Sequence, residues 1–161
     1  MQLYIHEANL DNEIHQKAIK TLLNLYASDL QGYNKCIPDS VLNELIPGLK
    51  RMTTGLIFLA QAEDEFAGMA ICFLSFSTFY ARPLINIHDF TVKKEFRNKG
   101  IGTALIEAVE AKAKELNCCK LTLEVQENNT TAMNLYMKTG FMKSIQNESD
   151  ERLFFLSKYL C

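Results

Sequence analysis

"RNKGIG", residues 97–102, precedes a stretch with the apolar periodicity of an amphipathic helix. The first amides of a helix lack partners within the chain, and the helix dipole adds partial positive charge there. Gly100 and Gly102 let a ligand approach the backbone closely, and Arg97 and Lys99 add positive charge. The stretch therefore predicts a phosphate-binding turn. The alternative is a tight turn whose glycines only satisfy local geometry.

Alternating and helical patterns of apolar residues divide the rest of the chain into strands and helices. Three successive strands between 55 and 92 indicate an antiparallel part of a sheet. The strand, helix and strand between 82 and 126 indicate a parallel crossover. We therefore expect an α/β (α+β) fold, with helices on both faces of a mixed sheet. The expected strands are 1–8, 55–63, 65–76, 82–92, 118–126 and 152–160, and the expected helices are 11–30, 39–50, 101–116 and 130–139.

The same patterns predict how the helices begin and which faces they bury. We expect Asp39 or Ser40 to cap the second helix and Asn128 or Asn129 to cap the last one, with Gly140 just beyond its end. The apolar face expected for the first helix consists of Ile14, Ala18, Leu22, Leu25 and Tyr26.

The composition is that of an ordinary globular domain, and we expect residues 1–161 to form one, with 48% hydrophobic and 22% charged residues. The net charge of −2 argues against a nucleic-acid partner recruited by bulk charge. The longest uncharged run, 66–81, is shorter than the roughly 20 residues of a membrane helix, and no signal peptide is visible. We therefore expect a cytoplasmic protein with no membrane partner. The five cysteines and three histidines show no metal-ligand spacing, so no metal site is expected.

Two other kinds of phosphate-binding loop were compared with the turn. The G-x-x-x-x-G-K-[S/T] pattern of a P-loop is absent. A dinucleotide fingerprint needs a third small residue where this chain has Leu105, and it should directly follow a strand. Glu124 does stand near the position of a ribose-binding acid, so a dinucleotide site stays as an alternative.

A second pattern, "NTTAMNLYMKTGF", lies downstream at 129–141. Together the two patterns resemble the signatures of the GNAT superfamily of N-acetyltransferases. The turn meets the pattern R/Q-x-x-G-x-G/A in full, and the second stretch meets N-x-x-A-x-x-x-Y-x-x-x-G-F at every position. The resemblance covers residues 85–141 well. The matching residues are Arg97, Gly100, Gly102, Asn129, Ala132, Tyr136, Gly140 and Phe141.

This resemblance implies a GNAT fold, a mixed and mostly antiparallel sheet of six to seven strands with four helices, and acetyl-CoA as co-substrate. In the family, the amides of 97–103 wrap the pyrophosphate, and the pantetheine arm lies between the strands at 89–92 and 119–125. The backbone of Phe90 and Val92 would then bond the arm and the thioester carbonyl, with Val92 as the polarising donor. The residues expected to bind the coenzyme are Phe90, Thr91, Val92, Arg97, Asn98, Lys99, Gly100, Ile101, Gly102, Thr103, Asn129 and Tyr136.

The resemblance also implies a general acid. Tyr136 matches the family's acid, which delivers a proton to the leaving CoA thiolate; the alternative is a core aromatic side chain. For the general base, His88, Asp89 and Glu124 are all candidates, because an imidazole titrates near neutrality and a carboxylate can also accept a proton. A β-bulge is common at this strand in the family, so the sequence does not decide which side chain faces the cleft.

Other charged residues have two possible roles each. Lys93 and Lys94 can meet the 3′-phosphate of the coenzyme or can be solvated charges. Asp29, Asp39 and Asp89 can hold a cationic substrate or can be ordinary surface charges.

We therefore expect an acetyl-CoA-dependent N-acetyltransferase that modifies a primary amine of a small molecule and can form a homodimer. "FSTFYARPLINIHDF", residues 76–90, resembles the arm of polyamine and related acetyltransferases. The alternatives are an enzyme acting on a protein or peptide amine and a non-catalytic acetyl-CoA sensor. A complete turn and the presence of Tyr136 favour catalysis.

Overall fold

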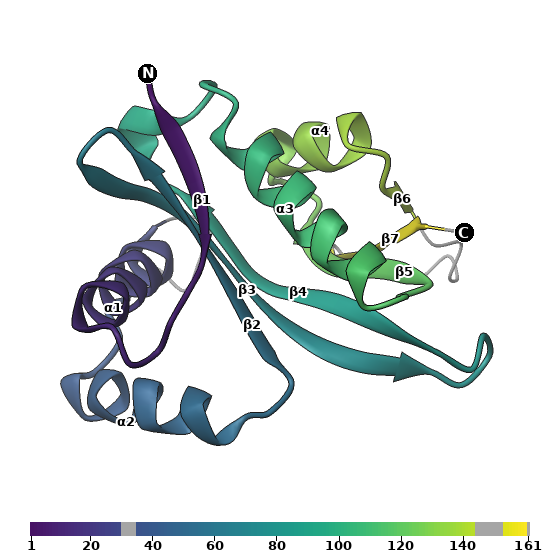
Figure 1. Cartoon of the computed structure of the whole chain (residues 1–161). Helices are drawn as coiled ribbons and strands as arrows, with labels where there is room; N and C mark the ends of the chain where they lie inside the picture. The colour runs from purple at the N-terminus through teal and green to yellow at the C-terminus, as the bar shows by residue number, and fades with distance from the viewer. Residues whose placement is uncertain (30–34, 144–152, 161) are drawn as a thin grey trace.

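The computed structural model describes residues 1–29, 35–143 and 153–160. Their strands form one seven-stranded sheet in the order β1-β2-β3-β4-β5-β7-β6 (Figure 1). The strands are β1 (Leu3–Glu7), β2 (Gly55–Ala62), β3 (Glu65–Ser77), β4 (Arg82–Val92), β5 (Lys120–Gln126), β6 (Met142–Lys143) and β7 (Leu153–Tyr159). The helices are α1 (Glu13–Ser28), α2 (Asp39–Arg51), the short 3₁₀ helix η1 (Lys94–Phe96), α3 (Ile101–Glu115) and α4 (Thr130–Lys138).

The sheet is mixed and mostly antiparallel, as predicted. Only β4 and β5 pair in parallel, through the crossover that contains α3, and the other described strand pairs are antiparallel. Helices α1 and α2 lie on one face of the sheet, whereas α3 and α4 lie on the other (Figure 1). Two small elements, η1 and β6, were not predicted. None of the helices in the described ranges is long and apolar enough to cross a membrane.

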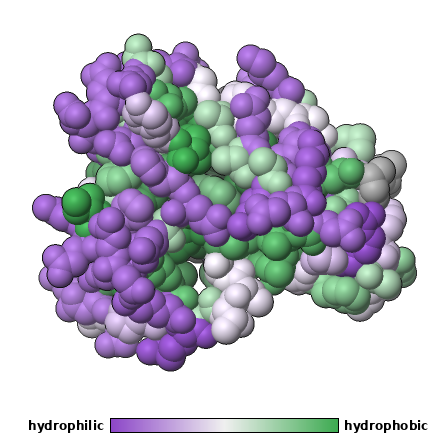
Figure 2. All heavy atoms as spheres, in the orientation of Figure 1, coloured by the Kyte–Doolittle hydropathy of each residue, from purple (hydrophilic) through white to green (hydrophobic). Residues whose placement is uncertain are grey.

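Each face of the sheet carries its own hydrophobic core. Beneath α3, Leu105 and Val109 pack with Ile85 and Leu121 of the sheet. On the opposite face, Ile19 of α1 belongs to a second core that also includes residues of α2, β2 and β3. Figure 2 shows hydrophilic side chains over the outer surface of α1 and α2, at the left of the view. This two-sided burial explains why β2 and β3 have long apolar runs rather than a strict alternation.

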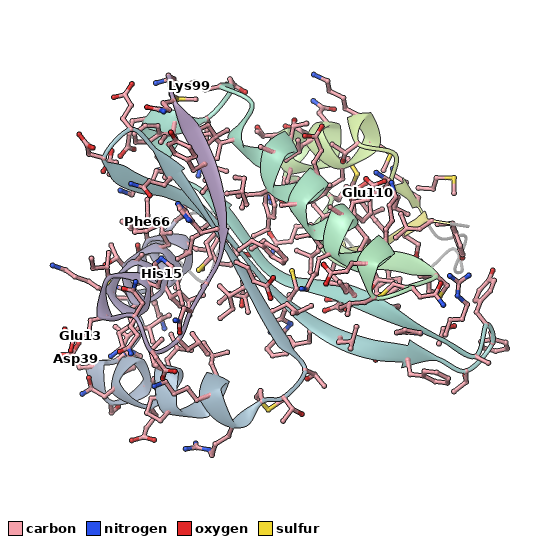
Figure 3. The ribbon with its side chains drawn as sticks, in the orientation of Figure 1. Glu13, His15, Asp39, Phe66, Lys99 and Glu110 are labelled. Carbon is pink, nitrogen blue, oxygen red and sulfur yellow. The ribbon has the colours of Figure 1, made fainter. Side chains whose placement is uncertain are left out.

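The predicted apolar face of α1 was wrong in part. Ile14 is 67% exposed and Leu25 is also exposed, because the helix packs on the sheet through Ile19, Leu22 and Ala27. His15, next to Ile14, contacts the ring of Phe66 on β3 edge-to-face (Figure 3). The predicted end at Leu30 lies outside the described residues.

Helix capping was predicted correctly for α4 and wrongly for α2. The side chain of Asn129 accepts a hydrogen bond from the amide of Ala132 at 3.1 Å, and Gly140 follows the helix with φ of 91°. Helix α2 has no side-chain cap, because its N-cap residue is Pro38, whose side chain has no hydrogen-bond acceptor. The carbonyl of Pro38 accepts the amides of Val41 and Leu42. The helix therefore begins at Asp39, one residue earlier than a cap at Asp39 would require.

An ion-pair network holds α3 against β7. Glu110 lies on the side of α3 nearest β6 and β7 (Figure 3) and contacts both Lys158 of β7 and Lys114 of its own helix. Burial acts to raise the pKa of Glu110, but the two lysines outweigh it and hold the pKa below its usual range.

Candidate active site

The two parallel strands separate halfway along their length. β4 and β5 pair only at Ile85, Asn86 and Ile87, which face Leu121, Thr122 and Leu123 respectively. The side-chain amide of Asn86 donates to the hydroxyl of Thr122 at 3.0 Å within this paired part. Beyond it no pairing joins 88–92 to 124–126, so the two strand ends stand apart as predicted.

A cleft of about 910 Å³ opens where the strands separate. All the predicted site residues line it except Lys99 and Ile101. The ammonium of Lys99 lies 5.2 Å from the centre of the Phe96 ring, and the side chain of Ile101 is buried in the core under α3. The predicted residues that line the cleft are His88, Asp89, Phe90, Thr91, Val92, Arg97, Asn98, Gly100, Gly102, Thr103, Glu124, Asn129 and Tyr136.

A β-bulge in β4 decides which side chains lie on the α1 face of the sheet. Ile87 pairs with Cys72 and Asp89 pairs with Ile71, so His88 is the extra residue. The His88 ring contacts Phe73, which packs against the core on the α1 face, and Ile71 belongs to that same core. The bulge therefore places both His88 and Asp89 on the α1 face of the sheet, whereas a regular strand would alternate them.

The backbone of β4 beyond the bulge offers hydrogen-bonding groups to the cleft. The amide of Lys93 donates to the carbonyl of Ala67 in β3 at 2.8 Å. Because backbone groups alternate sides along an antiparallel pair, those of Phe90 and Val92 point away from β3. The Val92 carbonyl accepts from Nε of Arg97 at 3.0 Å on that side. The amides of Phe90 and Val92 therefore face the gap between β4 and β5.

The turn before α3 has the geometry of an anion site. Gly100 is the N-cap of α3 with φ of 83°, a left-handed conformation that favours glycine, and no side chain caps this helix end. The first helical hydrogen bond joins the amide of Ala104 to the carbonyl of Gly100 at 3.0 Å. The amides of residues 101–103 precede that bond, so they can donate to a ligand.

Gly102 also has a packing role that the sequence did not predict. A Cβ added at Gly102 would lie 2.8 Å from Cδ2 of Leu135 on α4. Glycine therefore leaves room for the Leu135 side chain of α4 beside the first turn of α3. Gly102 therefore has a packing reason to lack a side chain, in addition to the role expected of it in coenzyme binding.

Three of the basic residues around the turn pair with carboxylates of the chain. Lys93 pairs with Glu65 at 2.9 Å. Arg97 and Lys94 both pair with Asp29, at 2.8 Å and 3.6 Å. Asp29 is thus not an ordinary surface charge: its side chain is only 12% exposed and it holds two cations.

Tyr136 lies where α4 meets the cleft. It is 5% exposed, and its ring contacts those of Phe90 and Phe141 edge-to-face. Burial, with a smaller contribution from Tyr26, raises the pKa of the Tyr136 hydroxyl well above its usual range. The hydroxyl therefore stays protonated at neutral pH, as a proton donor must.

The carboxylate of Asp89 sits in a half-buried position. Burial raises the pKa of Asp89, and the neighbouring His88 opposes that shift in part. Glu124, in contrast, is exposed on β5 and lines the cleft from the opposite strand. The cleft thus brings together one imidazole and three carboxylates, His88 with Asp29, Asp89 and Glu124, and the three carboxylates differ in environment.

The sequence did not identify several residues that line the cleft. Tyr26 was assigned to a helix face, and Asn86 to an ordinary strand position. No short motif marks either of them, because α1 and β4 meet the cleft only through tertiary packing. The residues that were missed include Tyr26, Asn86, Phe96, Gln126, Asn134 and Lys138.

Among known proteins, the chain is 28% identical over 130 residues to the uncharacterized N-acetyltransferase YhfO of Bacillus subtilis (strain 168), covering 77% of this chain and 81% of that protein. It is 43% identical over 56 residues to streptothricin acetyltransferase A of the same organism, covering 35% of this chain and 32% of that protein. The chain spans less than half of the length of several curated relatives that it matches.

A solved structure and a family model agree with these relatives. The chain superimposes with a TM-score of 0.68 on a GNAT family acetyltransferase from Elizabethkingia anophelis with acetyl-CoA bound, at 23% identity and over 98% of each chain. The model of the Acetyltransferase (GNAT) family matches residues 19–141, which is most of the chain. The chain therefore belongs to the GNAT family of acetyltransferases.

Proposed function

We propose that this protein transfers the acetyl group of acetyl-CoA to a primary amine of a small molecule. The observation that carries the proposal is the separation of β4 and β5 beside the open start of α3. It leaves strand amides and helix amides facing one cleft, which Tyr136 also lines.

The coenzyme fits this cleft in one orientation. The pyrophosphate would lie on the amides of residues 101–103, where the helix dipole also favours negative charge. The pantetheine arm would run between β4 and β5, with the amides of Phe90 and Val92 as donors. The oxygen of Asn129 caps α4, so its side-chain NH₂ group is left for the arm. Arg97 would contribute mainly through its backbone, because Asp29 and Val92 engage its guanidinium.

The chemistry follows from these positions. The neutral amine attacks the thioester carbon, and the amide of Val92 stabilises the oxyanion. The amine loses a proton to His88, Asp89 or Glu124, directly or through water. The intermediate then collapses, the C–S bond breaks, and the Tyr136 hydroxyl donates its proton to the departing sulfur.

The negative charge of carboxylates in the cleft supports a small cationic amine as substrate. Asp89 and Glu124 are carboxylates on the walls of the cleft, and they would attract a substrate with positive charge. Relatives include a thialysine N-epsilon-acetyltransferase of Bos taurus and an N-alpha-acetyltransferase 30 of Xenopus laevis, so a peptide amine is the second candidate.

A binding assay followed by a turnover assay tests the proposal. A thermal shift with acetyl-CoA measures binding, because a ligand of the folded state raises the melting temperature. Thiol release from acetyl-CoA is then measured with polyamines, amino acids, aminoglycosides and N-terminal peptides. We expect binding, and turnover with a small amine. Turnover only with peptides would favour the second candidate, binding without turnover would favour a sensor, and no binding would refute the coenzyme assignment.

A further inference from the structure

Asp29 occupies a position that helix electrostatics disfavours. It is the C-cap of α1, and the last turn of that helix has no basic residue. A carboxylate there faces the negative end of the helix dipole. The backbone amide of Asp29 caps the helix, so the carboxylate itself is not needed for the helix to end. A carboxylate that stands at such an unfavourable position indicates that its role lies outside the helix.

That role is visible in the contacts of the carboxylate. Asp29 accepts from the guanidinium of Arg97 at 2.8 Å and pairs with Lys94 at 3.6 Å. Lys94 begins η1, and Arg97 directly follows that helix. The Arg97 guanidinium also donates to the carbonyl of Val92 at 3.0 Å. One side chain of α1 therefore ties both ends of η1, and through Arg97 the end of β4, to a single point.

The turn that follows Arg97 needs such support. Asn98 has φ of 60° and Gly100 has φ of 83°, so two residues of the turn are left-handed. The left-handed conformation is uncommon for residues with a Cβ, so a free turn would populate other conformations. Holding the turn in its binding conformation beforehand lowers the entropy that a ligand must remove.

We propose that Asp29 is a positioning residue for coenzyme binding. It anchors Arg97 and thereby holds the turn at 97–102 in the conformation whose amides receive the pyrophosphate. This inference rests on the proposed function, because it assumes that the turn binds the pyrophosphate of CoA.

Simple electrostatics predicts the opposite effect, which makes the inference testable. Asp29, Lys94 and Arg97 together carry a net charge of +1, and Asp29→Asn would raise it to +2. Attraction for a pyrophosphate would then increase. Positioning predicts weaker binding of CoA, whereas charge alone predicts tighter binding.

The test measures CoA binding by titration calorimetry with the full chain. We expect Asp29→Ala to weaken binding about tenfold, the size of a lost hydrogen bond between charged groups. Asp29→Asn should weaken binding less, because its amide oxygen can still accept from Arg97. Asp11→Asn is the matched control: it removes an exposed pair with Lys50 at 2.7 Å, and CoA binding should not change.

Two further measurements separate positioning from general destabilisation. In the Arg97→Gln background, Asp29→Ala should cost little more, because residues that act through each other are not additive. Hydrogen exchange without ligand should become faster at 98–103 in Asp29→Ala, while β2 and β3 keep their protection. Unchanged or tighter CoA binding by both Asp29 variants, or fully additive losses, would overturn the inference. A wild-type protein that binds no CoA would instead overturn the proposed function, and the inference with it.

Discussion

The two halves of β4 have the same neighbour on one side and different surroundings on the other. Residues 82–87 precede the bulge and include the part that pairs with both β3 and β5; residues 88–92 pair with β3 only. Ile85 and Ile87 of the first half are buried in the core. All five residues of the second half line the cleft, as do Asn86 and Ile87 at the end of the first half. One strand thus passes from core packing to lining the cleft, and the bulge at His88 lies close to that change.

The largest expected effect is a loss of activity when Tyr136, which lines the cleft beside the second half of β4, is changed. Tyr136→Phe removes the proposed acid, so kcat should fall by about 10²–10⁴-fold, the usual range for acid–base catalysis. CoA affinity and melting temperature should stay near those of the wild type. Tyr159→Phe, at an exposed position on β7, is the control and should retain full activity. Unchanged turnover in Tyr136→Phe would remove this residue from the mechanism.

Substitutions in the first half of β4 should lower the stability of the fold. Ile85→Ala leaves a cavity beneath α3, so we expect a loss of about 2–5 kcal/mol in the free energy of unfolding, measured with urea. Val92→Ala, in the second half, should lose less, because its side chain is only partly buried. Equal losses at the two positions would show that the halves are not distinct in packing.

The bulge residue should affect the pH dependence of turnover. If His88 accepts the proton of the amine, His88→Ala should lower kcat/KM about ten- to a hundredfold near neutrality. It should also flatten the limb of the profile in which activity rises with pH, because that limb reports the essential base of the enzyme. His15→Ala, on α1 and away from the cleft, serves as the control. A profile that keeps its limb in His88→Ala would assign the base to Asp89, Glu124 or water.

The smallest expected effect is a gain in stability at Asp89. Its pKa is raised in the folded protein, so the ionised carboxylate destabilises the fold at neutral pH. Asp89→Asn should therefore raise the melting temperature at pH 7. The gain should shrink as the pH falls through the folded pKa and disappear below the ordinary aspartate pKa of about 3.9. Melting curves between pH 8 and pH 4 check this, and a gain that does not depend on pH would contradict the assignment.

Much of the fold could be predicted because its elements are marked locally. Apolar alternation and helical periodicity located four helices and six of the seven described strands, and Asn129 and Gly140 mark the ends of α4. The predictions failed where contacts between distant parts of the chain decide the structure. Helix α1 turned out to pack through Ile19 rather than Ile14, and the two residues of β6 are too few to form a pattern.

The site was predictable to the extent that motifs mark it. The glycine turn and Tyr136 belong to such motifs, and the structure brings both to one cleft. The ion pair of Asp29 with Arg97 joins residues far apart in the chain, so no spacing predicts it. Gly102 and Leu135 are likewise far apart in the chain, so no spacing predicts that they pack together. The bulge at His88 depends on the register with β3, which the sequence of β4 does not contain.

Hydrogen exchange along β4, with and without acetyl-CoA, tests the central claim most directly. If the coenzyme lies between the separated strands, exchange should slow at the amides of Phe90 and Val92 and at residues 101–103. The amides of Ile85 and Ile87 in the first half should not change. Saturating acetyl-CoA that leaves Phe90 and Val92 unaffected, or that protects only other parts of the chain, would contradict the claim that the second half of β4 is a coenzyme site.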